Sequence, residues 1–189
     1  MPGRSGIGSY RACGKRREVD LRVRPADDKG RGWISRLLLK RWGSERIVVH
    51  GDVYRPAELP GFVAVGDGER LGLLTYHIDG QDCEIVTVDS LHEGVGIGSA
   101  LIEAVKQAAR ESSCRRLWLI TTNDNLEALR FYQKRGFELV AVRRGAVDAA
   151  RKVKPEIPLW GNHGIPLRDE IELEMALRTT EEWEANWAG

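Results

Sequence analysis

The stretch EIVTVDSLHEGVGIGSAL, at residues 84–101, leads from an apolar strand pattern, through three alternating glycines, into the period of a helix. Gly94, Gly96 and Gly98 permit positive φ angles and let the backbone approach a ligand closely. The free N–H groups at the start of a helix, together with the positive end of its dipole, suit a phosphate. The stretch therefore predicts a cradle for a diphosphate group.

Three kinds of diphosphate ligand compete for a turn of this type. The Gly-x-Gly-x-x-Gly pattern of dinucleotide-binding folds fails, because its last position falls on Ser99 or on Leu101. The Gly-Lys-Ser/Thr ending of a P-loop is absent. Coenzyme A carries a pyrophosphate and needs neither feature. A glycine cluster alone is also typical of an ordinary turn, so the sequence around the cluster must show whether this turn binds a ligand.

Strand and helix patterns alternate on both sides of this stretch. Residues 66–68, Gly-Asp-Gly, predict a hairpin turn, and the apolar run 117–121 predicts a strand buried on both faces. Asp124 and Glu127 form a candidate capping box for a helix that ends at Gly136. Strands are expected at 20–24, 62–65, 70–78, 81–88, 117–121, 137–142 and 171–177, and helices at 33–42, after 98 and after 124. Residues 47–50 form a further short apolar run.

Composition narrows the class of protein. The chain has 189 residues, of which 42% are hydrophobic and 30% charged, and this predicts one globular domain. No apolar run approaches the ~20 residues that cross a membrane, and the basic N-terminus lacks the apolar core of a signal peptide. Cys13, Cys83 and Cys114 have no metal-like spacing, so free thiols in a reducing, cytoplasmic compartment are expected. The histidines form no zinc pattern, and no metal is expected.

The two ends of the chain differ from its centre. Residues 1–19 carry five basic residues against one acidic residue, which predicts a flexible tail. The other residues carry 24 basic and 27 acidic side chains, so no nucleic-acid partner is expected. Residues 20–178 are interpreted as the domain. Residues 179–189 are expected to form a helical tail that displays Trp183 and Trp187 on one side.

Two segments together resemble the signatures of one superfamily. Residues 93–98, EGVGIG, are similar to the Gln/Arg-x-x-Gly-x-Gly/Ala motif of the GNAT N-acetyltransferases. Residues 125–137, NLEALRFYQKRGF, are similar to its second segment, Asn-x-x-Ala-x-x-Phe-Tyr-x-x-x-Gly-Phe. The resemblance spans residues 20–178. Glu93 departs from the usual Gln or Arg. Binding survives because backbone N–H groups hold the pyrophosphate there, although a carboxylate near phosphates weakens it.

The resemblance implies an α/β (α+β) fold with a single mixed, mostly antiparallel, twisted sheet of six or seven strands flanked by helices. It also implies that the parallel strands at 81–88 and 117–121 splay apart and that acetyl-CoA lies between them. In the superfamily, the strand backbone binds the pantetheine arm and the glycine turn binds the pyrophosphate. Carried over, the coenzyme-binding residues are Val86, Val88, Glu93, Gly94, Val95, Gly96, Ile97, Gly98, Ser99, Asn125 and Tyr132.

The same resemblance implies direct transfer of the acetyl group to a neutral amine. Tyr132 corresponds to the donor that protonates the leaving thiolate, and a backbone N–H near Val88 polarises the thioester carbonyl. Glu84 lies where related histone acetyltransferases place their base, and it would act directly or through water. From the residues alone, Tyr132 is also consistent with a core aromatic, and Glu84 with a solvated strand carboxylate.

The connection at 143–170 is rich in Pro and Gly and long for a compact domain. In the superfamily this region often lines the acceptor pocket, so Trp160 or His163 is expected to face the substrate; a solvated basic loop is the alternative. The expected acceptor is a primary amine of a small molecule or peptide. A catalytically silent acyl-CoA sensor is the alternative function. No membrane partner is expected, and the protein is a monomer or a homodimer.

Overall fold

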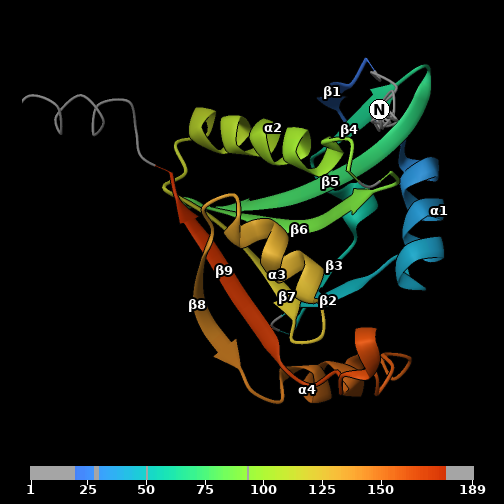
Figure 1. Ribbon diagram of the computed structural model, residues 1–189, viewed down its shortest axis with the longest axis vertical. Helices are drawn as coiled ribbons and strands as arrows, with labels where there is room; N and C mark the ends of the chain where they lie inside the picture. Colours follow the sequence, from blue (N-terminus) through green and yellow to red (C-terminus); the bar gives the residue numbers. More distant parts are fainter. Residues whose placement is uncertain (1–19, 28–29, 50, 93, 178–189) are drawn as a thin grey trace, which may run out of the picture.

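The computed structural model describes residues 20–27, 30–49, 51–92 and 94–177, which fold around one central sheet (Figure 1). The strands are β1 (Arg22–Pro25), β2 (Ile47–Val49), β3 (Asp52–Tyr54), β4 (Gly61–Gly66), β5 (Glu69–Asp79), β6 (Asp82–Ser90), β7 (Arg116–Thr122), β8 (Glu138–Arg143) and β9 (Glu170–Ala176). The helices are α1 (Arg31–Trp42), α2 (Ile97–Glu111), α3 (Leu126–Gln133) and α4 (Ala146–Val153), with short 3-10 turns η2 (Pro56–Glu58) and η3 (Asn162–Gly164).

Among these residues, seven strands form the sheet in the order β1-β4-β5-β6-β7-β9-β8, and β2 and β3 form a separate hairpin. The neighbours β6 and β7 run parallel, and the other neighbours run antiparallel. The mixed, mostly antiparallel sheet that the sequence predicts is confirmed. The predicted tails at 1–19 and 179–189 lie outside the described residues.

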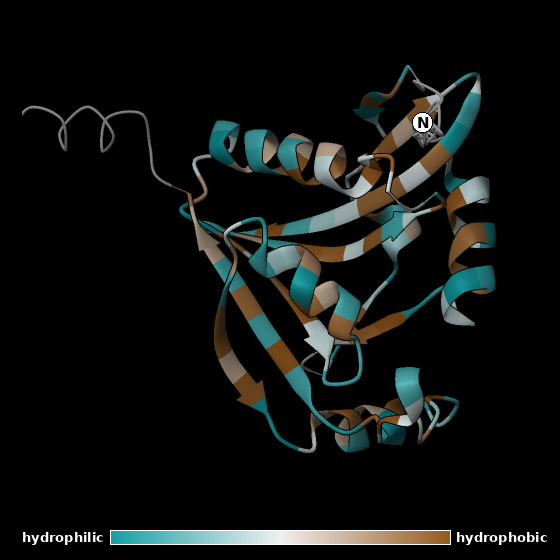
Figure 2. Cartoon of the chain, viewed as in Figure 1, coloured by the Kyte–Doolittle hydropathy of each residue, from teal (hydrophilic) through white to brown (hydrophobic). Residues whose placement is uncertain are grey.

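Helices cover the sheet on both faces. Figure 1 shows α2 and α3 side by side in front of the sheet, and Figure 2 shows hydrophobic and hydrophilic residues alternating along β9. The core under α2 and α3 includes Leu74, Ile85, Leu101, Val105, Leu119, Phe137 and Leu173, and the core under α1 consists of Ile34, Leu37, Leu38, Val63 and Leu73. Each such side chain contributes about 1.5–3 kcal/mol by leaving water, so the two cores hold the sheet rigidly between them.

Strands β6 and β7 separate part-way along their length. Parallel pairing joins Asp82–Ile85 of β6 to Arg116–Leu119 of β7 and ends there. β6 then follows β5 as far as Ser90, whereas β7 follows β9 as far as Thr122. A bulge at Val86 of β6, opposite β5, bends the strand where it leaves β7. The predicted splay of the parallel pair is confirmed.

The end of α1 holds the departing half of β6. The Trp42 indole nitrogen donates to Asp89 Oδ2 at 3.0 Å, and Arg41 Nε lies 3.5 Å from Asp89 Oδ1. Arg41 also donates to the Ser90 carbonyl at 3.0 Å. Burial raises the pKa of Asp89, and the Trp42 and Arg41 contacts oppose that rise by favouring the carboxylate. These contacts tie the end of β6 to α1, away from β7.

Two local predictions are wrong, and one helix was not predicted. β7 is buried mainly on one face, because Trp118 borders a cavity on the other face. The connection after β8 contains the unpredicted helix α4. The cap of α3 is Asn125, whose side-chain oxygen accepts the Ala128 N–H at 3.3 Å, so Asp124 and Glu127 do not form the capping box.

A second hairpin was not expected from the sequence. β2 pairs with β3 in antiparallel fashion, with Ile47 opposite Tyr54. The short apolar runs on either side of Gly51, which has a φ of 87°, were the available signal. By contrast, the predicted turn between β4 and β5 is confirmed, since Asp67 and Gly68 both have positive φ angles, as a type I′ hairpin requires.

Gly72 of β5 lets the start of α2 approach the sheet. A Cβ atom at Gly72 would lie 2.5 Å from Ile97 Cγ2 and 2.8 Å from the Asp89 carbonyl oxygen. We expect Gly72→Ala to lower the free energy of unfolding by about 1–3 kcal/mol, because the helix must move away. Gly32→Ala is the matched control, since its Cβ would lie 3.6 Å from the Arg36 side chain. Urea unfolding of both variants tests this, and equal stabilities would contradict it.

Candidate active site

The glycine turn after β6 leaves the first turn of α2 open to a ligand. Gly94 and Gly96 have φ angles of 76° and 86°, which side-chain-bearing residues rarely adopt. α2 starts at Ile97 with no side-chain cap and no acidic residue in its first turn. The N–H groups of this turn are therefore available to an anion. Val95 is exposed beside them, and Glu93 lies outside the described residues.

A cavity of about 540 Å³ opens beside this turn, and one wall of it is basic. Arg130, Lys134 and Arg135 line it together with Ser99 and one carboxylate, Glu127, whose Oε2 lies 3.6 Å from Arg130 Nη1. Arg135 donates to the Ser99 hydroxyl and to the Phe131 carbonyl at 2.7 Å, and its guanidinium lies 3.5 Å from the centre of the Phe131 ring. A helix N-terminus facing three cations suits a ligand with several phosphate charges, as in coenzyme A.

Sequence reasoning missed this basic wall. Arg130 and Lys134 are four residues apart and therefore lie on one face of the α3 segment. That spacing was the available signal. What the sequence did not reveal is that α3 packs beside the start of α2, where a Cβ at Gly98 would lie 2.9 Å from the Phe131 ring.

Tyr132 lies in the core between two aromatic rings. It is 8% exposed, and its ring centre lies 5.1 Å from that of Phe131 and 5.4 Å from that of Phe137. Burial raises the pKa of Tyr132, and the negative charge of Asp89 adds to the rise. No hydrogen bond of the Tyr132 hydroxyl is found within the described residues, and this oxygen is not among the fully buried atoms that lack a partner. The phenol is thus a core aromatic that keeps its proton.

Glu84 is buried at the place where β6 and β7 part. It is 4% exposed, lies opposite Trp118 in the next-to-last parallel pair, and accepts a hydrogen bond from the Tyr54 hydroxyl at 2.7 Å. Burial raises the pKa of Glu84, and Tyr54 and His77 oppose that rise. A carboxyl group with a raised pKa binds a proton more readily near neutral pH. The structure does not place Glu84 as a solvated strand residue.

Glu84 forms part of a cavity of about 410 Å³ on the face of the sheet away from α2. Four carboxylates, one imidazole, two aromatic rings and one aliphatic side chain line it: Asp52, Asp79, Asp82, Glu84, His77, Tyr54, Trp118 and Val53. β3 contributes Tyr54, β6 contributes Glu84, and β7 contributes Trp118, so three elements distant in sequence meet here. The gap between β6 and β7 thus has a basic cavity beside the glycine turn and an acidic cavity where the two strands are still paired.

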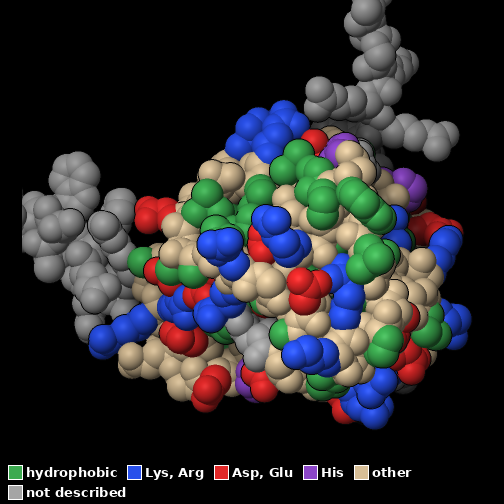
Figure 3. Space-filling view, turned by 90° about the horizontal axis from the view of Figure 1, so that it is seen from below, with side chains coloured by type: hydrophobic (Ala, Val, Ile, Leu, Met, Phe, Trp, Pro, Cys, Tyr) green, Lys and Arg blue, Asp and Glu red, His purple; other side chains and the backbone are tan. Residues whose placement is uncertain are grey.

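The two residues expected to face the acceptor lie elsewhere. Trp160 is 64% exposed and pairs with Pro166, and His163 is exposed with a φ of 58°. Neither lines the cavity beside Glu84. Asp124 anchors their loop by accepting the Asn162 backbone N–H at 2.7 Å. Figure 3 views the molecule from the end that carries α4, where apolar, basic and acidic side chains are interspersed.

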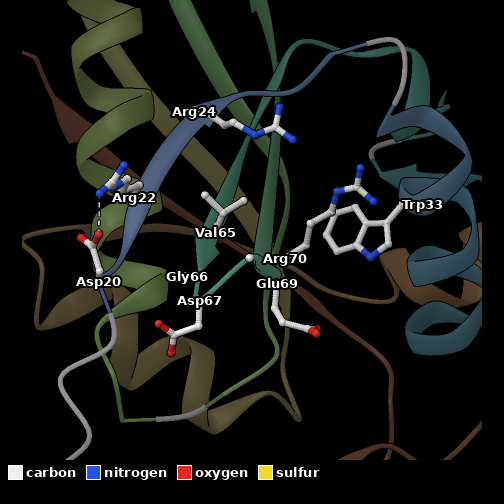
Figure 4. A pocket seen from close by; sticks show the side chains of 10 residues that line it. Asp20, Arg22, Arg24, Trp33, Val65, Gly66, Asp67, Glu69 and Arg70 are labelled. Carbon is white, nitrogen blue, oxygen red and sulfur yellow. Dashed lines mark hydrogen bonds and ion pairs between the residues drawn. The ribbon is translucent and has the colours of Figure 1, made fainter.

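A larger cavity, of about 850 Å³, lies at the other side of the sheet (Figure 4). Arg22, Arg24 and Arg70 point around it, and the Arg70 guanidinium lies 5.2 Å from the centre of a Trp33 ring. Arg22 is already paired with Asp20 at 2.6 Å. This cavity shares no lining residue with the two cavities beside β6 and is therefore separate from the split.

Comparison with known families agrees with this geometry. The model of the acetyltransferase (GNAT) family matches residues 22–137, which is more than half of the chain. The chain belongs to the GNAT acetyltransferase family. The matched region contains the split strands, the glycine turn, α2, α3 and the residues that line the two cavities beside β6. As a member of this family, the chain is an acyltransferase by class.

Two relatives of this GNAT chain match it over different lengths. Uncharacterized protein YdhI of Bacillus subtilis (strain 168) is 45% identical over 148 residues, which cover 78% of this chain and 92% of that protein. Streptothricin acetyltransferase of Streptomyces lavendulae is 37% identical over 81 residues, which cover 40% of this chain and 43% of that protein.

Solved structures share the GNAT fold. The IAA acetyltransferase from Bacillus cereus ATCC 14579 has a TM-score of 0.66 at 22% identity and covers 84% of this chain and 100% of its own. A GNAT acetyltransferase from Elizabethkingia anophelis, solved with acetyl-CoA bound, has a TM-score of 0.60 at 21% identity and covers 84% of this chain and 99% of its own. Identities this low establish the fold alone.

Three further observations concern the described part of the chain. Within the described ranges, no group of three or more His, Cys, Asp or Glu side chains is arranged to hold a metal ion. Cys83 and Cys114 are buried free thiols, and burial raises the pKa of Cys83 to about 12. A protonated, buried thiol is a poor nucleophile. No helix in the described part of the chain has the length and apolar character to span a bilayer.

Proposed function

We propose that this GNAT-family chain transfers the acetyl group of acetyl-CoA directly to a primary amine of a small molecule or peptide. The observation that carries the proposal is the end of β6–β7 pairing at Ile85 and Leu119, with the buried Glu84 beside that point. A pantetheine arm entering between the strands would bring its thioester to this place. An amine in the acidic cavity would approach it from the other face of the sheet.

The proposed coenzyme contacts follow the split. The edge of β6 that faces away from β5 has no β7 partner beyond Ile85, so the backbone of Val86 and Val88 is free to pair with the pantetheine amides. The turn from Gly94 to Ser99 would hold the pyrophosphate through backbone N–H groups. Asn125 caps α3 and would act by orienting that helix. The structures with acetyl-CoA bound in other GNAT proteins support this ligand.

The proposed chemistry uses three groups of the chain. The amine reacts in its neutral form, after losing any extra proton to solvent, because the nitrogen needs a free lone pair. Glu84 accepts, directly or through water, the proton that the nitrogen loses as the C–N bond forms, and later returns it to solvent. A backbone N–H near Val88 donates to the carbonyl oxygen as negative charge develops there. The C–N bond forms, the C–S bond breaks, and the Tyr132 hydroxyl gives its proton to the departing thiolate. The Tyr132 phenolate then takes back a proton from solvent.

The basic wall should strengthen acetyl-CoA binding. Replacing both Arg130 and Lys134 with Ala is expected to raise KM for acetyl-CoA about tenfold with little change in kcat, because exposed cations contribute modestly to phosphate contacts. Arg110→Ala, which removes an exposed cation from the far end of α2, is the matched control. Steady-state kinetics at constant ionic strength test this. An unchanged KM in the double variant would remove the basic wall from the coenzyme site.

Tyr54 should set the pH range of the reaction. Its hydrogen bond stabilises the charged Glu84 carboxylate and therefore opposes the rise in the Glu84 pKa. Tyr54→Phe removes that contact, so the pKa rises further and the acidic limb of kcat/KM should move up by about half to one pH unit. Because both proteins are measured with the same acceptor, the pKa of the amine affects both pH profiles equally. A limb that stays in place, or moves to lower pH, would exclude Glu84 as the titrating group.

Turnover separates an enzyme from an acyl-CoA sensor. The protein is incubated with acetyl-CoA and a panel of primary amines, and release of free thiol is measured. We expect acetylated product from at least one amine, with one thiol released per product. Tight acetyl-CoA binding with no turnover of any amine would favour the sensor. The name of the streptothricin acetyltransferase supports a small-molecule acceptor for this chain.

A further inference from the structure

The cavity beside Glu84 is negatively charged. Four carboxylates line it, and no lysine or arginine does. Within the described residues Asp52 and Asp79 make no ion pair. Arg116 lies under the Trp118 ring at 4.9 Å and contacts Asp82 at 3.4 Å, but the same guanidinium is also paired with Glu172 and Glu174. The cavity therefore keeps an excess of negative charge on the side from which the proposed acceptor would enter.

The carboxylates occupy two levels of this cavity. Glu84 lies at the buried level, next to the point where the strands part. Asp82 lies two residues earlier on β6, about 7 Å along the strand, and is paired across the hairpin with Asp79. Asp79 and Asp52 are exposed at the rim. An acceptor whose amine meets Glu84 would thus have a second set of carboxylates a short chain length away.

The walls between these levels are mainly aromatic, and they include the imidazole of His77, whose ring centre lies 5.7 Å from that of Tyr54. Tyr54 and Trp118 contribute aromatic rings, and Val53 contributes an aliphatic side chain. Such surfaces suit methylene groups, and aromatic faces also attract ammonium groups. The described carboxylates are not arranged to hold a metal ion. Their separation fits an extended organic cation better than a compact inorganic one.

We propose that the acceptor is a diamine or polyamine-like compound, in which one amine reacts at Glu84 and a second, still protonated, amine is held by Asp79, Asp82 and Asp52. This inference rests on the proposed function and names its substrate class. A chain of about four or five carbon atoms between the nitrogens spans the two levels, given C–C bonds of about 1.5 Å. The opposite charge of the rim then selects a dication over a neutral or acidic amine of equal length.

The test compares acceptors of matched length with the full chain. Putrescine, n-butylamine and γ-aminobutyrate share a four-carbon scaffold and differ in the remote group, which is an ammonium, a methyl end and a carboxylate. We expect kcat/KM for putrescine to exceed that for n-butylamine about tenfold or more, well above the doubling that two equivalent amines supply. γ-Aminobutyrate should be the poorest of the three.

Rim variants show whether the carboxylates cause the preference. Asp79→Asn and Asp52→Asn should each lower the putrescine-to-butylamine ratio about threefold, mainly through KM for putrescine. Glu138→Gln, an exposed carboxylate on β8, is the control for net charge and should keep the wild-type ratio. Equal kcat/KM for all three acceptors would overturn the inference and leave the proposed function standing. Binding of acetyl-CoA with turnover of no amine would overturn both.

Discussion

Glu84→Gln is expected to lower kcat by about 10²–10⁴-fold, the range by which a general base speeds a reaction. Gln has nearly the same shape as Glu and can still accept the Tyr54 hydrogen bond with its amide oxygen. It cannot take a proton from the amine. The substitution also removes a buried carboxylate whose pKa is raised by desolvation, so the fold should tolerate it.

The control for Glu84→Gln is Glu138→Gln, which changes an exposed carboxylate on the edge strand β8. Both variants are compared with wild type by steady-state kinetics across pH, after their stability has been measured. The acidic limb that Glu84 produces should disappear in Glu84→Gln and persist in the control. If Glu84→Gln kept wild-type kcat at saturating acceptor, the base would have to be another group.

Tyr132→Phe is expected to lower kcat by about 10²-fold while leaving the Kd for acetyl-CoA nearly unchanged. The raised pKa of Tyr132 keeps the phenol protonated at neutral pH, so its hydroxyl has a proton to give to the departing thiolate. Loss of the hydroxyl leaves the aromatic packing with Phe131 and Phe137 in place. The thiolate must then leave unprotonated, which slows the step.

Tyr76→Phe is the matched control for Tyr132→Phe. Tyr76 is a half-buried residue of β5 whose ring centre lies 5.9 Å from that of Phe62, away from both cavities beside β6. Its kcat should equal the wild-type value. Acetyl-CoA affinity, measured by calorimetry, separates loss of chemistry from loss of binding. A wild-type kcat in Tyr132→Phe would leave Tyr132 with only its packing role.

Local patterns carried most of the fold prediction. The Gly-Asp-Gly turn at 66–68 predicted the β4–β5 hairpin because positive φ angles favour such residues. The change from strand to helix period across the glycine turn predicted β6 and α2. The splay of β6 from β7 came from family resemblance, because no local pattern shows that pairing stops at Ile85.

What the sequence did not reveal depends on contacts between distant segments. Asp124 was expected to cap its own helix, yet it binds the backbone of Asn162, which is 38 residues away. Tyr54 belongs to no recognisable sequence motif, but folding brings its hydroxyl within 2.7 Å of Glu84 Oε2. Trp160 and His163 were expected at the acceptor because this region often lines the acceptor pocket in the superfamily, but family resemblance does not show which way a variable loop faces.

A crystal structure of the protein with coenzyme A tests the central claim most directly. The account predicts that the pantetheine amides pair with the backbone of Val86 and Val88, and that the phosphates lie against residues 94–99 and Arg130. The sulfur should lie between Tyr132 and Glu84. Continuous β6–β7 pairing as far as Ser90, with side chains filling the gap and the ligand bound elsewhere, would contradict the account.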